Sequence, residues 1–319
     1  MRSVMVTGAN GFVGQAFCHS LALSGRYVLP AVRSSTEKII GGRPSFIVGE
    51  IDIDTDWKSA LSGIDVVVHL ASRVHVMQDC SNDSLLAYRR VNTDGALNLA
   101  RQAADAGVSR FIFVSSVKVN GEGGDHVYSE DDAPSPADPY AISKWEAEQA
   151  LIDLSVSTGM EVVIVRPPLV YGPGVKANFL RMMHWLNRGV PLPFGGIHNR
   201  RSLVALGNLV HFLITCVDHS AAANQVFLVS DNEDLSTPEL LMRTAAAMGK
   251  KAHLIEIPEN VLKVGCLLLG KRDMSERLCG SLQVSISKAR NLMGWVPPMS
   301  VDEGLRVTAE RFLADLAKS

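Results

Sequence analysis

The sequence predicts an α/β protein in which a doubly wound parallel sheet carries helices on both faces. Three observations predict this fold class. Strand-like runs alternate with helical patterns through the first half of the chain. Two of these runs, 66–70 and 111–114, are apolar throughout, which is typical of strands that are buried on both faces. A glycine-rich turn, TGANGFVG, joins the first strand-like run to the first helical pattern.

The expected elements follow one another in the order that such a sheet requires. Strands are expected over residues 3–7, 27–32, 45–49, 65–70, 110–115, 161–165 and 225–230. Apolar residues have helical spacing over 12–23, 85–106 and 140–158. After Arg166 the composition becomes rich in Pro and Gly, which indicates a smaller, loop-rich domain. We therefore expect a larger domain over 1–168 and 202–230, and a smaller one over 169–201 and 231–319.

The bulk composition narrows the function classes. The 319 residues carry a formal net charge of −2 without basic clusters, which disfavours nucleic-acid binding. Five cysteines without a CxxC pair disfavour a zinc site and a disulfide framework and fit a reducing cytosol. No signal-peptide pattern opens the chain, and the apolar stretch 264–269 is too short to cross a membrane. We expect a cytoplasmic protein with no metal site and no membrane insertion.

The turn after the first strand has the spacing GxxGxxG and is expected to bind a dinucleotide. Gly8 permits the tight turn, Gly11 lets the backbone approach a pyrophosphate, and Gly14 lets the helix pack closely on the strand. Free N–H groups and the helix dipole attract anions at this helix N-terminus. Three glycines could also form a mere strand–helix turn. The expected cofactor contacts in this turn are Gly8, Asn10, Gly11, Phe12, Val13 and Gly14.

The second strand ends without the acidic residue that usually binds the adenosine ribose of NAD. Arg33 stands there instead, followed by two serines. A guanidinium and two hydroxyls suit a 2′-phosphate, so this strand end favours NADP(H) over NAD(H). The alternative is that Arg33 is a solvated charge at the end of a strand.

Tyr140 and Lys144 stand one helical turn apart in PYAISK, so their side chains emerge on the same helix face. A phenol with its ordinary pKa of ~10 is a poor acid or base at neutral pH. A nearby ammonium and the positive nicotinamide of an oxidised cofactor favour the phenolate and lower that pKa. Ser116, at the end of a strand, is well placed to share the substrate oxygen. Alternatively, YxxxK arises by chance in many helices, and Ser116 could cap the backbone.

Over essentially its full length, the chain resembles the extended short-chain dehydrogenases/reductases of the nucleotide-sugar epimerase and reductase group, of the bacterial O-antigen type. The matching segments are TGANGFVG, FVSSVKVNG, PYAISK, VNTDGALNLA and RPPLVYGPG. The resemblance implies a Rossmann-type fold, a catalytic triad of Ser116, Tyr140 and Lys144, and a homodimer paired through helices. Tyr140 and Lys144 are also expected to contact the cofactor. The remaining expected cofactor contacts are Glu50, Ile51, Leu70, Ala71, Ser72, Asn92, Ser115 and Pro167.

The substrate is expected to be a UDP-sugar or another nucleotide-diphosphate sugar. By resemblance, Asn178 and Arg201 contact the diphosphate, and Arg277 is a second candidate arginine. The alternatives are a strand-edge charge for Arg201 and a helix-surface charge for Arg277. A structural or solvated role is the alternative for His75. The expected substrate contacts are Arg73, His75, Ser116, Tyr140, Asn178, Arg201 and Arg277.

Two reactions at C4 of the sugar fit this family. A reductase delivers hydride once to a 4-keto sugar, whereas an epimerase takes hydride from C4 and returns it to the other face. Arg33 and the resemblance to O-antigen enzymes favour the reductase. Asn120 stands where many 4-epimerases have a tyrosine, which weakens a strict UDP-glucose 4-epimerase interpretation. We therefore expect reduction of UDP-2-acetamido-2,6-dideoxy-4-ketohexose to UDP-N-acetylquinovosamine or UDP-N-acetylfucosamine. A UDP-hexose (UDP-Glc/UDP-GlcNAc) 4-epimerase is the alternative, and a non-catalytic cofactor-sensing module is a remote one.

Overall fold

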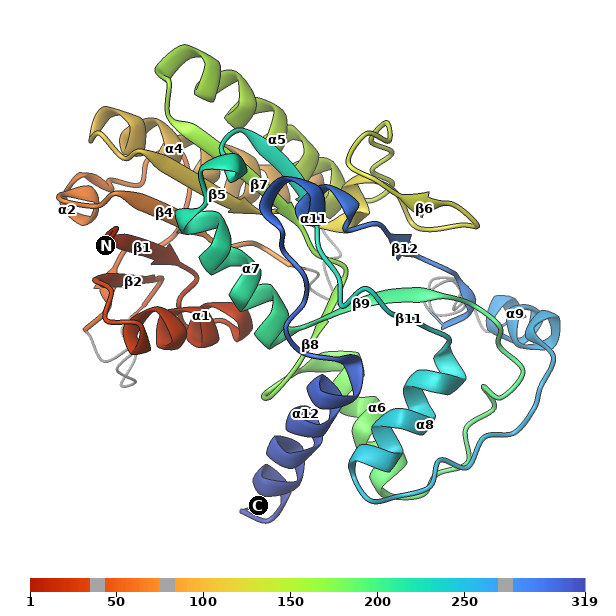
Figure 1. Cartoon of the computed structure of the whole chain (residues 1–319). Helices are drawn as coiled ribbons and strands as arrows, with labels where there is room; N and C mark the ends of the chain where they lie inside the picture. Colours follow the sequence, from red (N-terminus) through yellow and green to blue (C-terminus); the bar gives the residue numbers. More distant parts are fainter. Residues whose placement is uncertain (35–43, 75–83, 269–277, 319) are drawn as a thin grey trace.

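Seven parallel strands form the central sheet of the computed structural model, in the order β10-β7-β5-β4-β1-β2-β3 (Figure 1). The structure describes residues 1–34, 44–74, 84–268 and 278–318. The chain enters at β1 in the middle of the sheet, winds to one edge through β2 and β3, and then crosses to build the other half. This confirms the doubly wound, Rossmann-type sheet. The strands are β1 (Val4–Thr7), β2 (Val28–Val32), β3 (Phe46–Ile47), β4 (Val66–His69), β5 (Arg110–Val114), β7 (Glu161–Arg166) and β10 (Gln225–Leu228).

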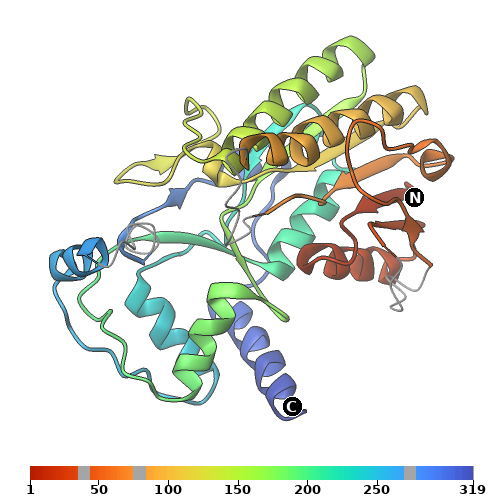
Figure 2. The ribbon, with the colours of Figure 1, turned by 180° about the vertical axis from the view of Figure 1, so that it is seen from behind.

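Helices cover both faces of this sheet, and the strand side chains alternate between them. On one face, α1 (Phe12–Leu23) and α7 (Leu206–Asp218) share a core with Val4 and Val6 of β1. On the other face, α4 (Ala96–Asp105) and α5 (Pro139–Thr158) pack over Met5 (Figure 2). The inner strands therefore have buried side chains on both faces, which explains the continuous apolar runs of β4 and β5. The short helix α2 (Lys58–Leu61) completes the second face.

The helix expected over 85–106 is three segments in the structure. These are α3 (Ser84–Tyr88), a π-helical stretch (Arg89–Gly95) and α4. A Cβ atom on Gly95 would lie 2.8 Å from Cγ2 of Ile51, so the chain passes close to the segment after β3 at this point. π-helical turns occur often at functional sites, and this one carries Asn92 into the protein interior.

The remaining elements lie mostly beyond the carboxyl ends of the sheet strands. The strands β8 (Leu169–Tyr171), β9 (Arg201–Ala205) and β11 (Asp234–Leu235) form a small sheet, and β6 (Val127–Tyr128) pairs with β12 (Gln283–Val284). One hydrophobic core joins α6 (Ala177–Asn187), α8 (Thr237–Ala247) and α12 (Val301–Leu316). The helices α9 (Glu259–Leu268) and α11 (Ser287–Met293) complete the fold. The division into a cofactor domain and a substrate domain stays a prediction.

No helix in the described part of the chain combines the length and the apolar character that are needed to cross a lipid bilayer.

Candidate active site

The glycine turn between β1 and α1 is as tight as its sequence predicts. Gly8 has a φ of +63°, and a Cβ atom there would lie 2.8 Å from the backbone nitrogen of Ala71. A Cβ atom on Gly14 would lie 2.2 Å from the carbonyl oxygen of Gly8. Gly11 is the N-cap of α1, and no side chain of the described residues caps the helix there. The first N–H groups of α1 are therefore left to an anionic ligand.

Replacing Gly14 by Ala should weaken both folding and cofactor binding. The added methyl group overlaps backbone on two sides, since Cα of Ala9 would also lie only 2.8 Å away. We expect a loss of about 1–3 kcal/mol in the free energy of unfolding, as for other overpacked sites. Urea unfolding and titration with NAD measure the two effects. Gly265→Ala in α9 is the matched control, because no described atom lies within 4 Å of its Cβ position. Equal behaviour of the two variants would contradict the prediction.

Ser116, Tyr140 and Lys144 meet at the carboxyl end of β5. Tyr140 and Lys144 lie in the first turns of α5, which Asp138 caps by accepting a 2.7 Å hydrogen bond from the Ala141 N–H. The Tyr140 hydroxyl forms hydrogen bonds with the side chains of Ser72 and Ser116. The Nζ atom of Lys144 donates a 3.0 Å hydrogen bond to the carbonyl of Val114, two residues before Ser116. The structure thus brings the expected triad together.

Burial dominates the electrostatics of this site. It raises the pKa of Tyr140 to about 12, although the hydrogen bonds with Ser72 and Ser116 oppose the rise. It lowers the pKa of Lys144 to about 7, although the nearby Glu148 carboxylate opposes this effect. The expected lowering of the Tyr140 pKa is therefore not a property of the side chains alone. Further positive charge beside the phenol would act against the effect of burial.

The buried Lys144 ammonium should make the stability of the protein without added nucleotide depend on pH. The pKa of Lys144 is about 7 in the folded protein, against the ordinary lysine value of 10.5. Between these pH values the unfolded chain binds more protons, so the free energy of unfolding rises with pH. Lys144→Met should remove this slope and stabilise the protein at pH 7 by on the order of a few kcal/mol. Urea unfolding from pH 7 to pH 9.5 measures this slope, and Lys250→Met, at an exposed position, is the control. Parallel curves for the wild type and Lys144→Met would refute the prediction.

Asn92 joins the loop after β4 to α5 through hydrogen bonds of its side chain. Its Oδ1 atom accepts hydrogen bonds from the Ser72 hydroxyl at 3.0 Å and from the Arg73 N–H at 2.8 Å. Its Nδ2 atom donates to the Ser143 hydroxyl at 3.0 Å and to the Arg73 carbonyl at 3.1 Å. The Asn92 side chain is thus engaged by protein groups, and it orients Ser72 toward Tyr140. Ser72 was expected only as a cofactor contact, and its place beside the phenol was missed.

The expected cofactor residues line the carboxyl edge of the sheet. Leu70 and Ala71 follow β4, and the Ala71 N–H donates to the Thr7 hydroxyl of β1. Ser115 and Pro167 follow β5 and β7, where backbone hydrogen bonds to Val165 and from Val117 hold them. Further along this edge is a cavity of about 460 Å³. The residues lining it are Glu50, Ile51, Arg73, Leu86, Ala87, Arg90 and Val91.

The expected substrate residues are only partly gathered. Asn178 is exposed at the start of α6, and Arg201 donates a 2.9 Å hydrogen bond to the carbonyl of Gly280. Burial lowers the pKa of Arg201. Arg73 lies with its guanidinium carbon 5.8 Å from the Tyr88 ring centre. His75 and Arg277 lie outside the described residues.

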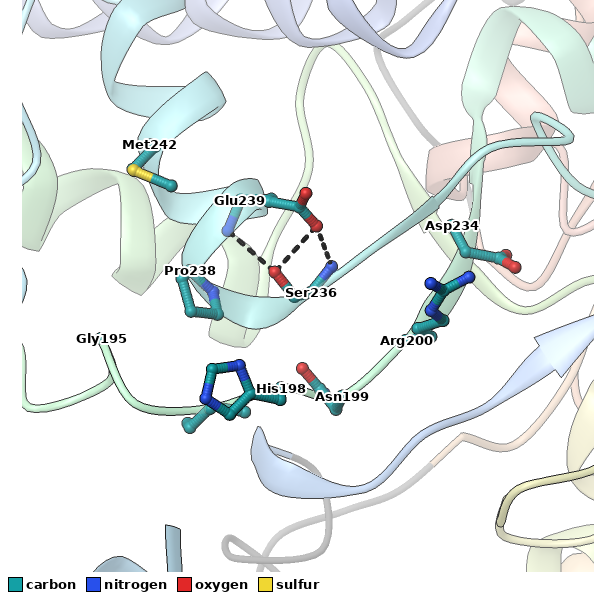
Figure 3. Close-up of a pocket in the computed structure, with 10 residues that line it drawn as sticks. Gly195, His198, Asn199, Arg200, Asp234, Ser236, Pro238, Glu239 and Met242 are labelled. Atoms are coloured by element: carbon teal, nitrogen blue, oxygen red, sulfur yellow. Dashed lines mark hydrogen bonds between the residues drawn. The ribbon is translucent and has the colours of Figure 1, made fainter. Parts of the chain in front are cut away.

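A second cavity, of about 450 Å³, lies between the segment before β9 and the start of α8 (Figure 3). Arg200 and Asp234 lie at one end of it and Met242 at the other, while Ser236 and Glu239 form the capping box of α8. Of the adjacent residues Arg200 and Arg201, Arg200 lines this cavity. The expected contact of Arg201 with the diphosphate stays a prediction.

Comparisons with known proteins agree with this geometry. A model of the NAD dependent epimerase/dehydratase family matches residues 4–230. A UDP-glucose 4-epimerase of Vibrio cholerae is 47% identical over 316 residues, which cover 98% of this chain and 96% of that protein. The solved structure of MoeE5 in complex with UDP-glucuronic acid and NAD has a TM-score of 0.80 and 25% identity, over 98% of this chain and 99% of that one. A UDP-glucose 4-epimerase from Thermotoga maritima, solved with UDP-glucose, has a TM-score of 0.79 at 22% identity, over 98% and 99% of the two chains. At that identity the likeness shows the fold alone.

The preference for NADP(H) is wrong. The matching family is NAD dependent, and MoeE5 was solved with NAD. In the structure Nη1 of Arg33 lies 3.7 Å from Oε1 of Glu50, so the Arg33 guanidinium has a carboxylate beside it. Arg33 is therefore not a positive charge that stands alone at the end of β2.

The preference for 4-keto reduction is also wrong, because the relative that is 47% identical over nearly the whole chain is a 4-epimerase. Arg33 was an argument for reduction, and Asn120 was an argument against a strict UDP-glucose 4-epimerase. Asn120 is buried, donates a 3.0 Å hydrogen bond to the Ser129 carbonyl, and accepts one of 3.0 Å from Arg166. Its side chain is therefore bonded to protein groups on both sides.

Proposed function

Since the chain belongs to the NAD dependent epimerase/dehydratase family and is an enzyme, we propose that it is a UDP-hexose 4-epimerase that uses NAD. The observation that carries the proposal is the Ser116–Tyr140–Lys144 site in a chain that is 47% identical to a UDP-glucose 4-epimerase. A role in O-antigen biosynthesis stays a prediction.

The residues of the glycine turn fit NAD. Side chains at Gly8 and Gly14 would collide with backbone, so the turn keeps the tight form that brings the α1 N-terminus to a pyrophosphate. Glu50 and Ile51 line the cavity at this edge, and we propose that Glu50 accepts hydrogen bonds from the adenosine ribose and that Ile51 contacts the adenine. Bound NAD supplies the acceptor and donor of hydride for the sugar carbon.

Tyr140 is the acid–base group in this proposal. Its phenolate takes the proton of the C4 hydroxyl as that carbon is oxidised. The phenol returns the proton after the 4-keto sugar has rotated to present its other face. The Lys144 ammonium, one helical turn away, favours the phenolate electrostatically. The Ser116 hydroxyl hydrogen-bonds the same phenolic oxygen and is placed to orient the sugar oxygen toward it.

The part formed by 169–201 and 231–319 supplies the groups for the nucleotide end of the substrate. We propose that Arg201 and Asn178 contact the diphosphate. Arg201 then gives up its hydrogen bond with the Gly280 carbonyl and binds the diphosphate instead. Arg73, beside Tyr88 and the Tyr140 ring, is the proposed contact for the sugar.

We also propose a homodimer paired through α4 and α5, since α5 exposes Val156 and Ile152 on its outer side. Light scattering during size-exclusion chromatography tests the dimer.

The decisive experiment is incubation of the purified protein with UDP-glucose or UDP-N-acetylglucosamine, without added reductant, and chromatography of the products. We expect the 4-epimeric sugar nucleotide to form until equilibrium is reached, with no net consumption of reduced nicotinamide. Tyr140→Phe serves as the control for a contaminating host epimerase. Absence of interconversion with every UDP-hexose tested would refute the proposal.

Glu50 is expected to set the preference between the two dinucleotides. Its carboxylate would repel a 2′-phosphate, and at an exposed site such repulsion amounts to about 1 kcal/mol. Glu50→Gln should therefore lower the ratio of NAD to NADP affinity about 5-fold, mainly by improving NADP binding. Titration of the stripped protein with both dinucleotides measures the ratio. The exposed Glu310→Gln in α12 is the control, and an unchanged ratio in Glu50→Gln would count against this role.

A further inference from the structure

An ion pair joins the two segments that carry the catalytic hydroxyls. Nζ of Lys118 lies 2.5 Å from Oδ2 of Asp138 and 3.0 Å from Oε1 of Glu122. Lys118 belongs to the short helical turn Val117–Val119, which begins directly after Ser116. Asp138 is the N-cap of α5, which carries Tyr140. Each partner of the pair is thus two residues from a catalytic residue.

Further hydrogen bonds join Asp138 to the backbone of α5 and Lys118 to the Ser116 hydroxyl. Oδ1 of Asp138 accepts the 2.7 Å hydrogen bond from the Ala141 N–H, while its Oδ2 atom faces Lys118. The Lys118 N–H donates a 3.3 Å hydrogen bond to the Ser116 hydroxyl oxygen. Lys118 therefore contacts Ser116 through its backbone and the α5 N-terminus through its side chain. A displacement of either partner would change the separation of the Ser116 and Tyr140 hydroxyls.

We propose that Lys118 and Asp138 are positioning residues for the acid–base pair Ser116 and Tyr140. The ion pair fixes the separation of the two hydroxyls. The Lys118 ammonium also counters the negative charge of a carboxylate that lies close to the phenol. This inference rests on the proposed epimerase function.

The charge environment of Tyr140 supports the second part of the proposal. After burial, the charge of Asp138 is a further cause that raises the pKa of Tyr140. Other titratable neighbours among the described residues are Lys144 on α5 and Tyr88 of α3, whose ring centre is 6.1 Å from that of Tyr140 and lies under Arg73. Although burial acts to lower it, the pKa of Lys118 is raised by Asp138 and Glu122, so this side chain stays charged.

The test uses Lys118→Met, Lys118→Arg and Asp138→Asn in the full-length protein, each with and without Ser116→Ala. We expect Lys118→Met to lower kcat about 10-fold with little change in KM, since small displacements of reacting groups cost this much or more. Lys118→Arg should restore most of kcat. In the Ser116→Ala background the Lys118→Met substitution should have a much smaller effect, because the hydroxyl it positions is gone. Lys263→Met, which breaks a similar ion pair with Glu259 on α9, is the control.

The pH profile separates positioning from a merely structural role. Lys118→Met removes the Lys118 positive charge from beside Asp138 and should move the acidic limb of kcat to higher pH. Asp138→Asn keeps an N-cap acceptor but removes the charge, and should move that limb to lower pH. Unshifted profiles, or an equal loss of kcat in the Ser116→Ala background, would overturn the inference.

Tyrosinate absorbance of the NAD complex, with Tyr140→Phe as baseline, gives the same two shifts without turnover. If the wild type does not epimerise, the proposed function fails, yet opposite absorbance shifts would still support the ion pair's role. Equal titrations in all variants would overturn it.

Discussion

Replacing Tyr140 by Phe should remove most of the epimerase activity and leave the fold and the bound NAD in place. The substitution deletes one oxygen atom, and with it the group that takes and returns the C4 proton. General acid–base groups of this kind contribute about 10²–10⁴ in rate, so kcat should fall by that factor. Ser72 and Ser116 lose a hydrogen-bond partner, but both hydroxyls have other polar neighbours.

The measurement is the initial rate of UDP-glucose epimerisation, together with the amount of NAD that remains bound after gel filtration. Tyr27→Phe is the matched control, because Tyr27 precedes β2 at the opposite end of the strands and is 46% exposed. A Tyr140→Phe variant that keeps more than a tenth of the wild-type kcat would show that another group transfers the proton.

Glu148→Gln should cause the largest loss of stability among single polar substitutions in α5. The Arg166 guanidinium binds both oxygens of Glu148, with Nε at 3.0 and 3.2 Å and Nη2 at 2.5 Å. Both side chains are almost fully buried, at 0% and 3% exposure. Removing one partner leaves a buried charge without its counter-charge, which costs about 3–5 kcal/mol. Urea unfolding measures the loss.

A double substitution separates the contribution of charge to stability from the contribution of packing at this ion pair. Glu148→Leu combined with Arg166→Met replaces the ions by apolar side chains, and should recover much of the stability that Glu148→Gln loses. Glu303→Gln, which breaks an exposed ion pair with Arg306, should leave the unfolding midpoint nearly unchanged. A loss below about 1 kcal/mol in Glu148→Gln would contradict the role of the pair.

Features that depend on local spacing could be read from the chain alone. The first helix has the expected bounds, Phe12–Leu23, because apolar periodicity and the flanking glycines mark both ends. The buried strands β4 and β5 were visible as apolar runs, and the positions of Ser116, Tyr140 and Lys144 follow from a strand end and one helical turn. The bend of the expected helix 85–106 into a π-helical stretch was not visible, because it depends on packing at Gly95 against Ile51.

The sequence alone was enough for the succession of strands and helices, for the glycine turn and for the clustering of Ser116, Tyr140 and Lys144, since each is set by neighbours along the chain. The folded structure decided the partners of side chains that are distant in sequence. Arg33 lies beside Glu50 from the segment after β3, a carboxylate that the end of β2 does not reveal. Asn120 turns inward to Arg166, and Asn92 aims Ser72 at Tyr140. Spacing along a chain carries no record of such contacts, because they form only when separate strands and helices pack side by side.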